Sequence, residues 1–363
     1  MVIAQVLTSF QVGGQEVMVV ELATRQCARG NRVVAVTLEQ SEPGPLYTAF
    51  ARAGIEVVHV PKRGPGFDIT LVPRLARLFR RHEVDVVHAH NHLPLIYGAL
   101  AGKLNGCTVV TTRHGQDEGS PRQIWLRRQA VRLVDSFVAV SNQVANNARA
   151  LKLAVEPKLT IIENGIDLGR YGPHPSWRAE ARAEIGVPEN ARVIGTVCRL
   201  VVCKNLGLLL RSCLPHLSDE LRLVIIGDGP ERRVAESFAA LHAHGKFVRF
   251  LGLRNDVARL LSGLDLFALS SKVEGHPIAV IEAMATGLPV LATKVGGVPE
   301  MIEDGTTGFL SQMEDTAFAT RLAEALEQCH RWPEMGRAAM SVAHQRFSSE
   351  IMADRYQRIY DRA

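Results

Sequence analysis

Short apolar runs alternate with amphipathic stretches along the whole chain. The runs are apolar on both faces, which is typical of parallel strands that helices cover on both sides. Between them, stretches such as Gln15–Arg29, Leu71–His82 and Ile124–Leu133 have the pattern of helices. Alternation of this kind over the whole length predicts an α/β fold. The predicted strands are Val2–Leu7, Arg32–Val36, Val57–Val60, Val84–His88, Thr108–Thr112, Ser136–Val140, Leu159–Ile162, Arg192–Cys198, Arg222–Ile226, Val248–Leu251, Leu264–Leu269 and Leu288–Ala292.

A break in this pattern near residues 165–176 predicts a boundary between two domains. Asn164-Gly165-Ile166-Asp167 is a turn signal, and the closely spaced prolines that follow it resist both helix and strand. We therefore assign residues 1–166 to an N-terminal domain and residues 167–347 to a C-terminal domain. Open parallel sheets bind ligands at the carboxyl ends of their strands. Two such sheets facing each other predict a binding site in the cleft between the domains.

Composition supports a globular protein with an uneven charge. The 363 residues are 47% hydrophobic and 22% charged, which argues against a disordered or fibrous chain. The net charge is +5, and residues 1–165 carry +6 against −1 for the rest. No stretch of about 18 apolar residues predicts a membrane span, and the first residues indicate a strand and no signal peptide.

Several common active-site signatures are missing from the sequence. The six cysteines form no CxxC pair, which favours reduced thiols and a cytoplasmic location. Neither GxxxxGK[ST] nor GxGxxG occurs, so ATPase and NAD-dependent functions lose their main support. The sequence has no HExxH. No two aspartates are separated by one residue, so a D-x-D site for a nucleotide-bound metal is also absent.

The N-terminal half offers glycines and histidines at predicted strand ends. Gly13 and Gly14 precede a predicted helix, where backbone N–H groups favour phosphate oxygens; a plain tight turn is the alternative. His88-Ala-His90-Asn-His92 could bind a metal, but we favour a buried, hydrogen-bonded His88 and a cleft role for the others. His114 also follows a strand, where an imidazole can bind a hydroxyl, carry a proton or serve in the core.

The C-terminal half offers two cations after one predicted strand. Arg199 and Lys204 follow the strand that ends near Cys198. A guanidinium and an ammonium there can bind a diphosphate and stabilise its charge as it leaves. A solvated pair of surface cations is the alternative.

Two glutamates flank a predicted helix start in the same half. Glu274 lies in a loop, Pro277 suits the first turn of a helix, and Glu282 lies further along that helix. Carboxylates accept hydrogen bonds from vicinal diols, so one could hold a sugar and the other a ribose. The free N–H groups of residues 276–278 would lie beside the same ligand. A solvated Glu282 is the alternative.

In these motifs the chain resembles the retaining nucleotide-sugar glycosyltransferases of family 4, which have the GT-B fold. The resemblance covers nearly the whole chain, with all motifs in the family's order. Two positions depart from the pattern: His276 stands where Phe is common, and Glu163 where Pro often precedes Asn-Gly. The motifs are Gly13-Gly14-Gln-Glu16, His88-Ala-His90, Thr112-Arg-His114-Gly, Val140-Ser-Asn142, Glu163-Asn-Gly-Ile-Asp167, Arg199-Leu-Val-Val-Cys-Lys204, Gly227-Asp-Gly-Pro230, the glutamates of Glu274–Glu282 and Gly296-Gly-Val-Pro-Glu300.

The resemblance implies two Rossmann-like domains, with a C-terminal helix (348–363) that packs back on the first. Arg199 and Lys204 would contact the diphosphate, which Gly14 would approach from the other domain. Glu282 would bind the ribose, and Glu274 and His114 the transferred sugar. The full implied donor set is Gly13, Gly14, Arg199, Lys204, Arg254, Glu274, Gly275, His276, Pro277, Ile278 and Glu282. The implied catalytic set is His114, Arg199, Lys204 and Glu274, with His88, His90, Asn91 and Asp117 on the acceptor side.

The implied reaction moves a hexose or N-acetylhexosamine from a nucleoside diphosphate sugar to an acceptor hydroxyl, with retention at the anomeric carbon. We expect a UDP-sugar, with a GDP-sugar as the alternative donor, and a glycan, a lipid-linked or a small-molecule acceptor. No metal, no other cofactor and no nucleic acid is expected. Basic amphipathic stretches at 75–82 and 122–132 raise an anionic membrane surface as a further partner, at the inner face of the membrane. A sugar-nucleotide epimerase or hydrolase, or a non-catalytic sugar-binding protein, is the alternative.

Overall fold

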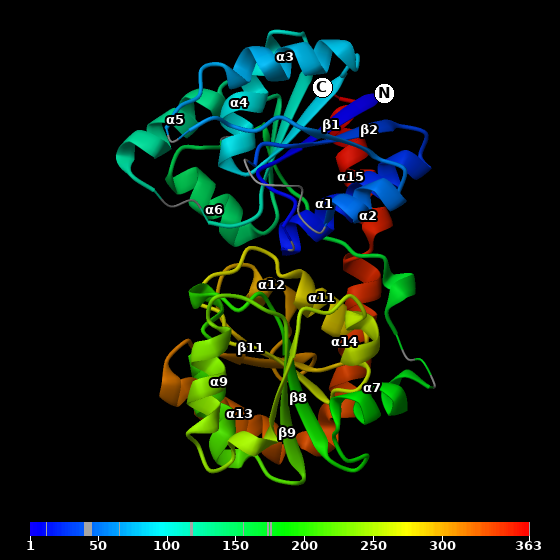
Figure 1. The fold of residues 1–363 in the computed structure, drawn as a ribbon, viewed down its shortest axis with the longest axis vertical. Helices are drawn as coiled ribbons and strands as arrows, with labels where there is room; N and C mark the ends of the chain where they lie inside the picture. The colour runs from blue at the N-terminus through cyan, green and yellow to red at the C-terminus, as the bar shows by residue number, and fades with distance from the viewer. Residues whose placement is uncertain are drawn as a thin grey trace. The chain divides into compact units, whose positions relative to one another are not determined.

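The structure is a computed structural model, and it describes residues 1–11, 13–39, 46–64, 66–116, 119–154, 156–172, 174 and 176–362 (Figure 1). The chain divides into two compact units, which we call the N unit and the C unit. The N unit comprises Met1–Gly165 and Ser349–Ala363, and the C unit comprises Ile166–Ser348. The boundaries predicted from the sequence lie within one residue of these divisions.

The N unit is built on a seven-stranded parallel sheet with the order β3-β2-β1-β4-β5-β6-β7. Helices α1, α2 and α15 pack together on it, and so do α3, α4 and α5 (Figure 1). Its strands are β1 (Val2–Leu7), β2 (Arg32–Thr37), β3 (Glu56–His59), β4 (Val86–His90), β5 (Thr108–Arg113), β6 (Ser136–Ala139) and β7 (Leu159–Ile161). Its helices are α1 (Gly14–Ala28), α2 (Leu46–Arg52), α3 (Leu71–Arg81), α4 (His92–Lys103), α5 (Pro121–Val131), α6 (Asn142–Ala150) and α15 (Ser349–Tyr360).

The C unit repeats this plan with a six-stranded parallel sheet in the order β10-β9-β8-β11-β12-β13. In both units the order is that of a doubly wound Rossmann sheet. Its strands are β8 (Arg192–Val197), β9 (Leu221–Ile226), β10 (Val248–Gly252), β11 (Leu266–Leu269), β12 (Val290–Thr293) and β13 (Gly308–Ser311). Its α-helices are α7 (Trp177–Ile185), α8 (Leu206–Cys213), α9 (Arg232–Ala240), α10 (Val257–Leu261), α11 (Ile278–Ala285), α12 (Val298–Met301), α13 (Asp315–Glu327) and α14 (Trp332–Arg346).

Local sequence signals explain where two of the helices begin or end. Ser120 caps α5 by accepting the N–H of Gln123, whose side chain returns a bond to the Ser120 backbone, and Pro121 occupies the first helical position. At the other end of a helix, Gly186 adopts a left-handed φ of 75° and terminates α7. Most of the apolar strands are buried on both faces, as their composition predicts, whereas the sheet-edge strands β3, β7 and β10 are partly exposed.

Two strand predictions need correction. The strand predicted at Val84–His88 spans Val86–His90 instead, so the chain turns at Asn91, which has a φ of 64°. His90 is therefore a fully buried strand residue. The sequence reading also missed β13, because a four-residue edge strand between polar residues carries little pattern.

The C-terminal helix α15 belongs to the N unit. Arg25 and Arg29 of α1 form ion pairs with Glu350 (2.8 Å) and Asp354 (2.7 Å) of α15. On its other side, Tyr356 and Tyr360 are buried against the N-unit sheet. In the described part of the chain, no helix has both the length and the hydropathy to cross a membrane.

Candidate active site

The centre of the candidate site is a partly buried ion pair at the carboxyl edge of the C-unit sheet. Lys204 follows β8, and Glu274 lies in the loop that follows β11. Lys204 Nζ lies 2.5 Å from Glu274 Oε1, and Ser271 Oγ donates to the same oxygen at 2.6 Å. Burial alone would lower the pKa of Lys204, but the charge of Glu274 outweighs it and raises that pKa above its usual value. Lys204 therefore stays protonated at neutral pH beside Glu274.

Glycines of the predicted Gly296-Gly-Val-Pro-Glu300 motif hold the Glu274 loop in place. Gly296 has a φ of 54°, and a Cβ built on it would lie 1.8 Å from the Glu274 carbonyl oxygen. The N–H of Gly297 donates to the carbonyl of Gly275 at 2.9 Å. From the neighbouring strand, Thr293 Oγ1 donates to the Ser271 carbonyl at 2.6 Å. The carboxylate of Glu274 thus depends on a backbone contact that only glycine permits.

Gly296→Ala is expected to destabilise the C unit by about 3 kcal/mol, because the methyl group meets backbone and the φ is positive. Urea denaturation followed by circular dichroism would measure this change. Gly305→Ala is a matched control, since Gly305 also has a positive φ of 81° but no atom within 4 Å of its Cβ position. Equal losses for the two variants would show that backbone conformation, and not the close approach, determines the effect.

Arg199 is held by a second pair of glycines. It is exposed, and its side chain has no hydrogen bond or ion pair among the described residues. The N–H of the next residue, Leu200, donates to the Asp228 carbonyl at 2.9 Å. A Cβ on Gly229 would lie 2.4 Å from the Leu200 carbonyl oxygen, and one on Gly227 would lie 1.9 Å from that of Cys198. The Gly227-Asp-Gly-Pro230 motif therefore positions the backbone that carries Arg199.

Helix α11 carries Ile278 and Glu282 of the predicted donor set. Glu282 Oε1 accepts a hydrogen bond from Tyr171 Oη at 2.6 Å, so a merely solvated Glu282 is excluded. The sequence predicts Pro277 in the first turn of a helix. The structure instead has Pro277 as the N-cap of α11, and the helix begins at Ile278. No local pattern indicates Tyr171 as the partner of Glu282, because the two residues lie 111 positions apart.

His276 is buried at the start of the same segment. Only 3% of its surface is exposed, and its ring lies edge-on to Phe347 with centroids 5.2 Å apart. Burial, with a smaller contribution from Arg346, lowers its pKa to about 3. The imidazole is therefore neutral at physiological pH and packs as an aromatic ring.

Arg254 makes a different set of contacts. Its guanidinium is paired with Asp256 at 2.8 Å and with Glu184 at 2.6 Å. The same two carboxylates also contact Arg259. Within the C unit, Arg254 is thus part of a four-residue ionic cluster, and its place in the implied donor set stays a prediction.

The predicted donor residues Gly13 and Gly14 lie at the carboxyl edge of the N-unit sheet, after β1. Gly13 caps α1, and Gly14 is its first residue. A Cβ on Gly13 would lie 2.5 Å from Glu16 Oε2, so a carboxylate lies against this helix start. Asp117 lies outside the described residues.

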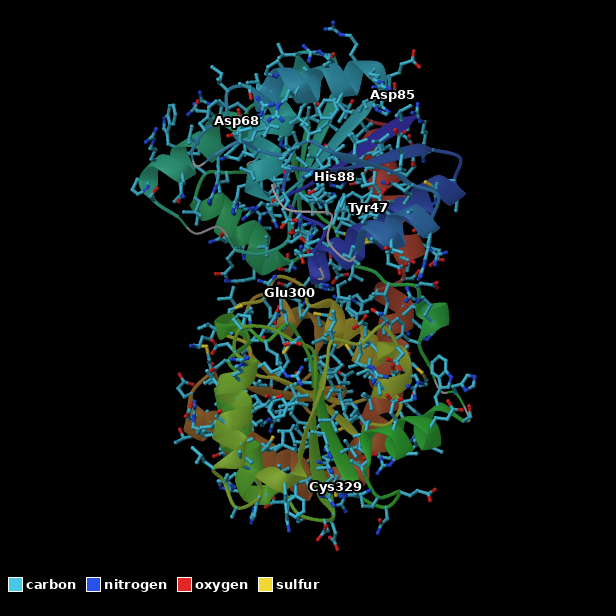
Figure 2. The ribbon with its side chains drawn as sticks, in the orientation of Figure 1. Tyr47, Asp68, Asp85, His88, Glu300 and Cys329 are labelled. Atoms are coloured by element: carbon cyan, nitrogen blue, oxygen red, sulfur yellow. The ribbon has the colours of Figure 1, made fainter. Side chains whose placement is uncertain are left out.

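Three histidines of the N unit are neutral and connected. His88 and His90 are fully buried, and His88 lies inside the unit in Figure 2. Burial lowers the pKa of all three, to about 3 for His90 and well below the usual value for His88 and His114. His90 Nδ1 lies 3.0 Å from His114 Nε2, and Asn91 Oδ1 accepts the backbone N–H of His114 at 3.1 Å. Among the described residues no group of three His, Cys, Asp or Glu side chains could hold a metal ion.

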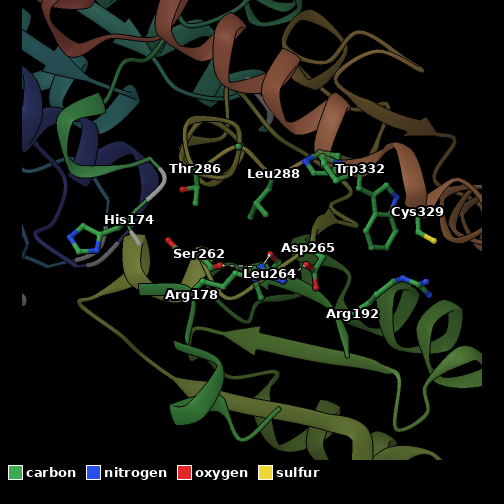
Figure 3. A pocket seen from close by; sticks show the side chains of 13 residues that line it. His174, Arg178, Arg192, Ser262, Leu264, Asp265, Thr286, Leu288, Cys329 and Trp332 are labelled. Atoms are coloured by element: carbon green, nitrogen blue, oxygen red, sulfur yellow. Dashed lines mark hydrogen bonds and ion pairs between the residues drawn. The ribbon is translucent and has the colours of Figure 1, made fainter. Parts of the chain in front are cut away.

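A cavity of about 600 Å³ lies at the opposite, amino-terminal edge of the C-unit sheet (Figure 3). Arg192 begins β8, and Leu264 and Asp265 precede β11, so these lining residues belong to the strand starts. No residue of the predicted donor set lines this cavity. It is therefore distinct from the carboxyl edge, where the sequence predicts binding.

Comparison with known proteins agrees with the fold and the motif order. The family model described as Glycosyltransferase Family 4 matches residues 12–170, and that described as Glycosyl transferases group 1 matches residues 191–328. The N-acetyl-alpha-D-glucosaminyl L-malate synthase of Bacillus anthracis is 29% identical over 96% of this chain and 94% of its own. The D-inositol 3-phosphate glycosyltransferase of Actinosynnema mirum is 30% identical over 82% and 80%.

Solved structures show the same architecture. The structure of Anabaena Alr3699/HepE in complex with UDP-glucose superposes with a TM-score of 0.86 at 25% identity and covers 100% of both chains. Both the family and the two-sheet fold predicted from the motifs are thereby confirmed. The chain belongs to glycosyltransferase family 4, has the GT-B fold and is a glycosyltransferase.

Proposed function

We propose that the chain transfers a hexose or N-acetylhexosamine from a nucleoside diphosphate sugar, with UDP as the favoured nucleotide, to an acceptor hydroxyl with retention. The observation that carries the proposal is the Lys204–Glu274 pair at the carboxyl edge of the C-unit sheet. The names of the compared proteins support the donor class: Alr3699/HepE binds UDP-glucose, and two relatives are named for sugar transfer.

The cations of the β8–α8 connection would bind and neutralise the diphosphate. Arg199 is exposed and free of partners in the described structure, so it can engage phosphate oxygens without breaking a pair. Lys204 stays protonated next to Glu274. As the anomeric bond breaks with oxocarbenium character, negative charge grows on the leaving diphosphate, and both cations stabilise it more than they stabilise the ground state. This arrangement would need no metal, and unchanged activity in excess EDTA is the expected result.

The carboxylates would bind hydroxyl groups. Glu274 Oε1 is occupied by Lys204 and Ser271, whereas Oε2 has no hydrogen bond within the described ranges and is left to accept one from the transferred sugar. Glu282 would hold the ribose diol, with Tyr171 orienting it. The acceptor hydroxyl would attack from the leaving-group face, and a donor phosphate oxygen would take its proton.

Arg199→Ala is expected to weaken binding of the donor about 10- to 100-fold, because a charge-assisted hydrogen bond to the diphosphate is lost. A thermal-shift screen of UDP-, GDP- and ADP-sugars measures it, since a bound donor stabilises the fold by mass action. Arg337→Ala removes the same charge from an exposed position of α14 and should leave donor binding unchanged.

Three outcomes of the donor screen decide the proposal. Transfer of sugar to an added acceptor, with the anomeric configuration retained by NMR, supports it. Release or isomerisation of the sugar with no transfer to any acceptor would instead indicate a hydrolase or an epimerase. Failure of every donor to bind or react would refute the proposal.

The acceptor lies on the side of the N unit in this proposal. Its groups are Asn91 and the exposed Arg122 and Trp125 of α5, the latter 56% exposed. His88 and His90, which the resemblance places on the acceptor side, are fully buried and do not reach an acceptor. Sedimentation with liposomes of varied anionic lipid content distinguishes a membrane-bound acceptor from a free one.

A further inference from the structure

Eight polar side chains form one continuous hydrogen-bonded chain through the interior of the N unit. They come from β1, α1, β4, β5, the residue after β5 and α15, and seven of the eight are buried. The sequence motifs include only His88, His90, Thr112 and His114 among them. In order, the members are His114, His90, Gln5, Gln26, Tyr360, His88, Thr112 and Tyr356.

The first half of this hydrogen-bonded chain joins the residue after β5 to β4, β1, α1 and α15. His114 Nε2 lies 3.0 Å from His90 Nδ1, and His90 Nε2 lies 2.7 Å from Gln5 Oε1. Gln5 Nε2 donates to Gln26 Oε1 at 2.8 Å. Gln26 Nε2 then donates to Tyr360 Oη at 3.1 Å, which brings in the C-terminal helix.

The second half returns to the sheet. Tyr360 Oη lies 2.8 Å from His88 Nδ1, and His88 Nε2 lies 2.7 Å from Thr112 Oγ1. Thr112 Oγ1 in turn lies 3.0 Å from Tyr356 Oη. Every step is of normal hydrogen-bond length.

The direction of these bonds determines where each imidazole carries its proton. An amide oxygen can only accept, so His90 Nε2 donates to Gln5. A neutral His90 then has a bare Nδ1, which must accept from His114 Nε2. His114 is neutral as well, so its other nitrogen, Nδ1, carries a lone pair and no proton.

The rest of the chain obeys the same direction. Tyr360 accepts from Gln26 and is thereby left to donate to His88 Nδ1. His88 then donates from Nε2 to Thr112. At every step of the hydrogen-bonded chain from His114 to Tyr356, one partner can donate and the other can accept.

The hydrogen-bonded chain ends at His114 with one ring nitrogen that is not used. His114 Nδ1 is buried and has no hydrogen-bond partner among the described residues. It lies just after β5, at the edge of the sheet where parallel sheets bind ligands.

We propose that Gln5, Gln26 and Tyr360 act as positioning residues that lock His114 in its Nε2–H tautomer, so that Nδ1 is an obligate hydrogen-bond acceptor. Such an atom binds a substrate hydroxyl and repels a carboxylate. The site therefore selects a neutral sugar at this position and disfavours a uronic acid. The selectivity rests on the proposed transfer function, whereas the tautomer does not.

The tautomer is measured directly by long-range ¹H–¹⁵N NMR of histidine-labelled full-length protein, with His114→Asn to assign the signal. The expected spectrum has an unprotonated Nδ1 and a protonated Nε2 on His114. A proton on Nδ1 would overturn the proposal, whether or not any transfer activity is found.

Tyr360→Phe breaks the chain between Gln26 and His88, so both glutamine amides can turn over and His114 should exchange between tautomers. The expected effect on transfer is a fall of about tenfold in the preference for UDP-glucose over UDP-glucuronate. Tyr356→Phe is the matched control, because it removes a buried hydroxyl of the same helix at the far end of the hydrogen-bonded chain and leaves the steps between Tyr360 and His114 intact. Equal effects of the two variants on tautomer and preference would show that the chain is only structural.

Discussion

Lowering the pH from 7 to 5 is expected to destabilise both units through their buried histidines. His90 and His276 each have a pKa of about 3 in the fold, because burial disfavours the charged imidazole. In the unfolded chain the same side chains bind a proton near pH 6.5. Below that pH the unfolded state therefore binds more protons than the native state, and stability falls as the pH falls.

The size of this effect follows from linkage. A histidine that stays neutral in the fold lowers the free energy of unfolding by about 1.4 kcal/mol for each pH unit below 6.5. At pH 5 the loss is about 2 kcal/mol for each such histidine. The loss continues until the pH approaches 3, where His90 and His276 also protonate in the fold. Free carboxyl groups titrate near pH 4 and do not contribute in the upper part of this window. Urea unfolding at pH 7, 6 and 5 measures the slope.

His276→Phe separates the C-unit contribution from that of the N unit. Phenylalanine keeps the edge-on packing against Phe347 and removes the titrating group. The variant should lose about 2 kcal/mol less than the parent between pH 7 and 5. His242→Gln, at an exposed position, should leave the slope unchanged. Identical slopes for the parent and His276→Phe would mean that His276 is protonated in the native protein.

Glu274→Gln is expected to lower kcat/KM by about 10²- to 10³-fold, the loss seen when one preorganised electrostatic contact to a transition state is removed. The amide keeps the volume and still accepts a hydrogen bond from Lys204 or Ser271. It removes the negative charge that holds Lys204 and that would strengthen bonding to the sugar hydroxyl as positive charge develops on the ring. Because this bonding grows in the transition state, kcat should fall more than KM rises.

Two controls accompany this variant. Glu327→Gln makes the same change at an exposed position of α13 and should retain full activity. Donor binding by thermal shift tests whether Glu274→Gln still folds and binds. A variant that binds the donor and keeps activity within threefold of the parent would remove Glu274 from the catalytic set.

Much of the fold and part of the site could be predicted because they depend on local patterns. Apolar runs that helices separate are sufficient to predict parallel strands, and a site at their carboxyl ends follows from that topology. Glu274 and Lys204 were found because each follows a recognisable strand. Their direct contact at 2.5 Å was not predicted, since nothing in the spacing of 70 residues specifies it.

The sequence predicts the bounds of a buried strand less well, because these depend on partners that lie far away in the sequence. The strand at Val86–His90 was placed two residues too early, because apolar residues on both faces leave the register of a buried strand open. The shift brings His90 into the strand and turns the chain at Asn91, which decides where His114 can reach.

By itself the sequence determined the two doubly wound sheets, the family and the edge of each sheet that carries the polar residues, because periodicity and motif order encode them locally. Only the tertiary structure decided that the glycines at 227, 229 and 296 hold Arg199 and Glu274 by close backbone contact. It alone decided as well that Tyr360 is linked to His114 through four hydrogen bonds whose partners are up to 334 residues apart in the sequence. The physical reason is the same in both cases: a contact energy depends on distance in space, and the distance between two residues far apart in sequence is defined only once the sheet and its helices have packed.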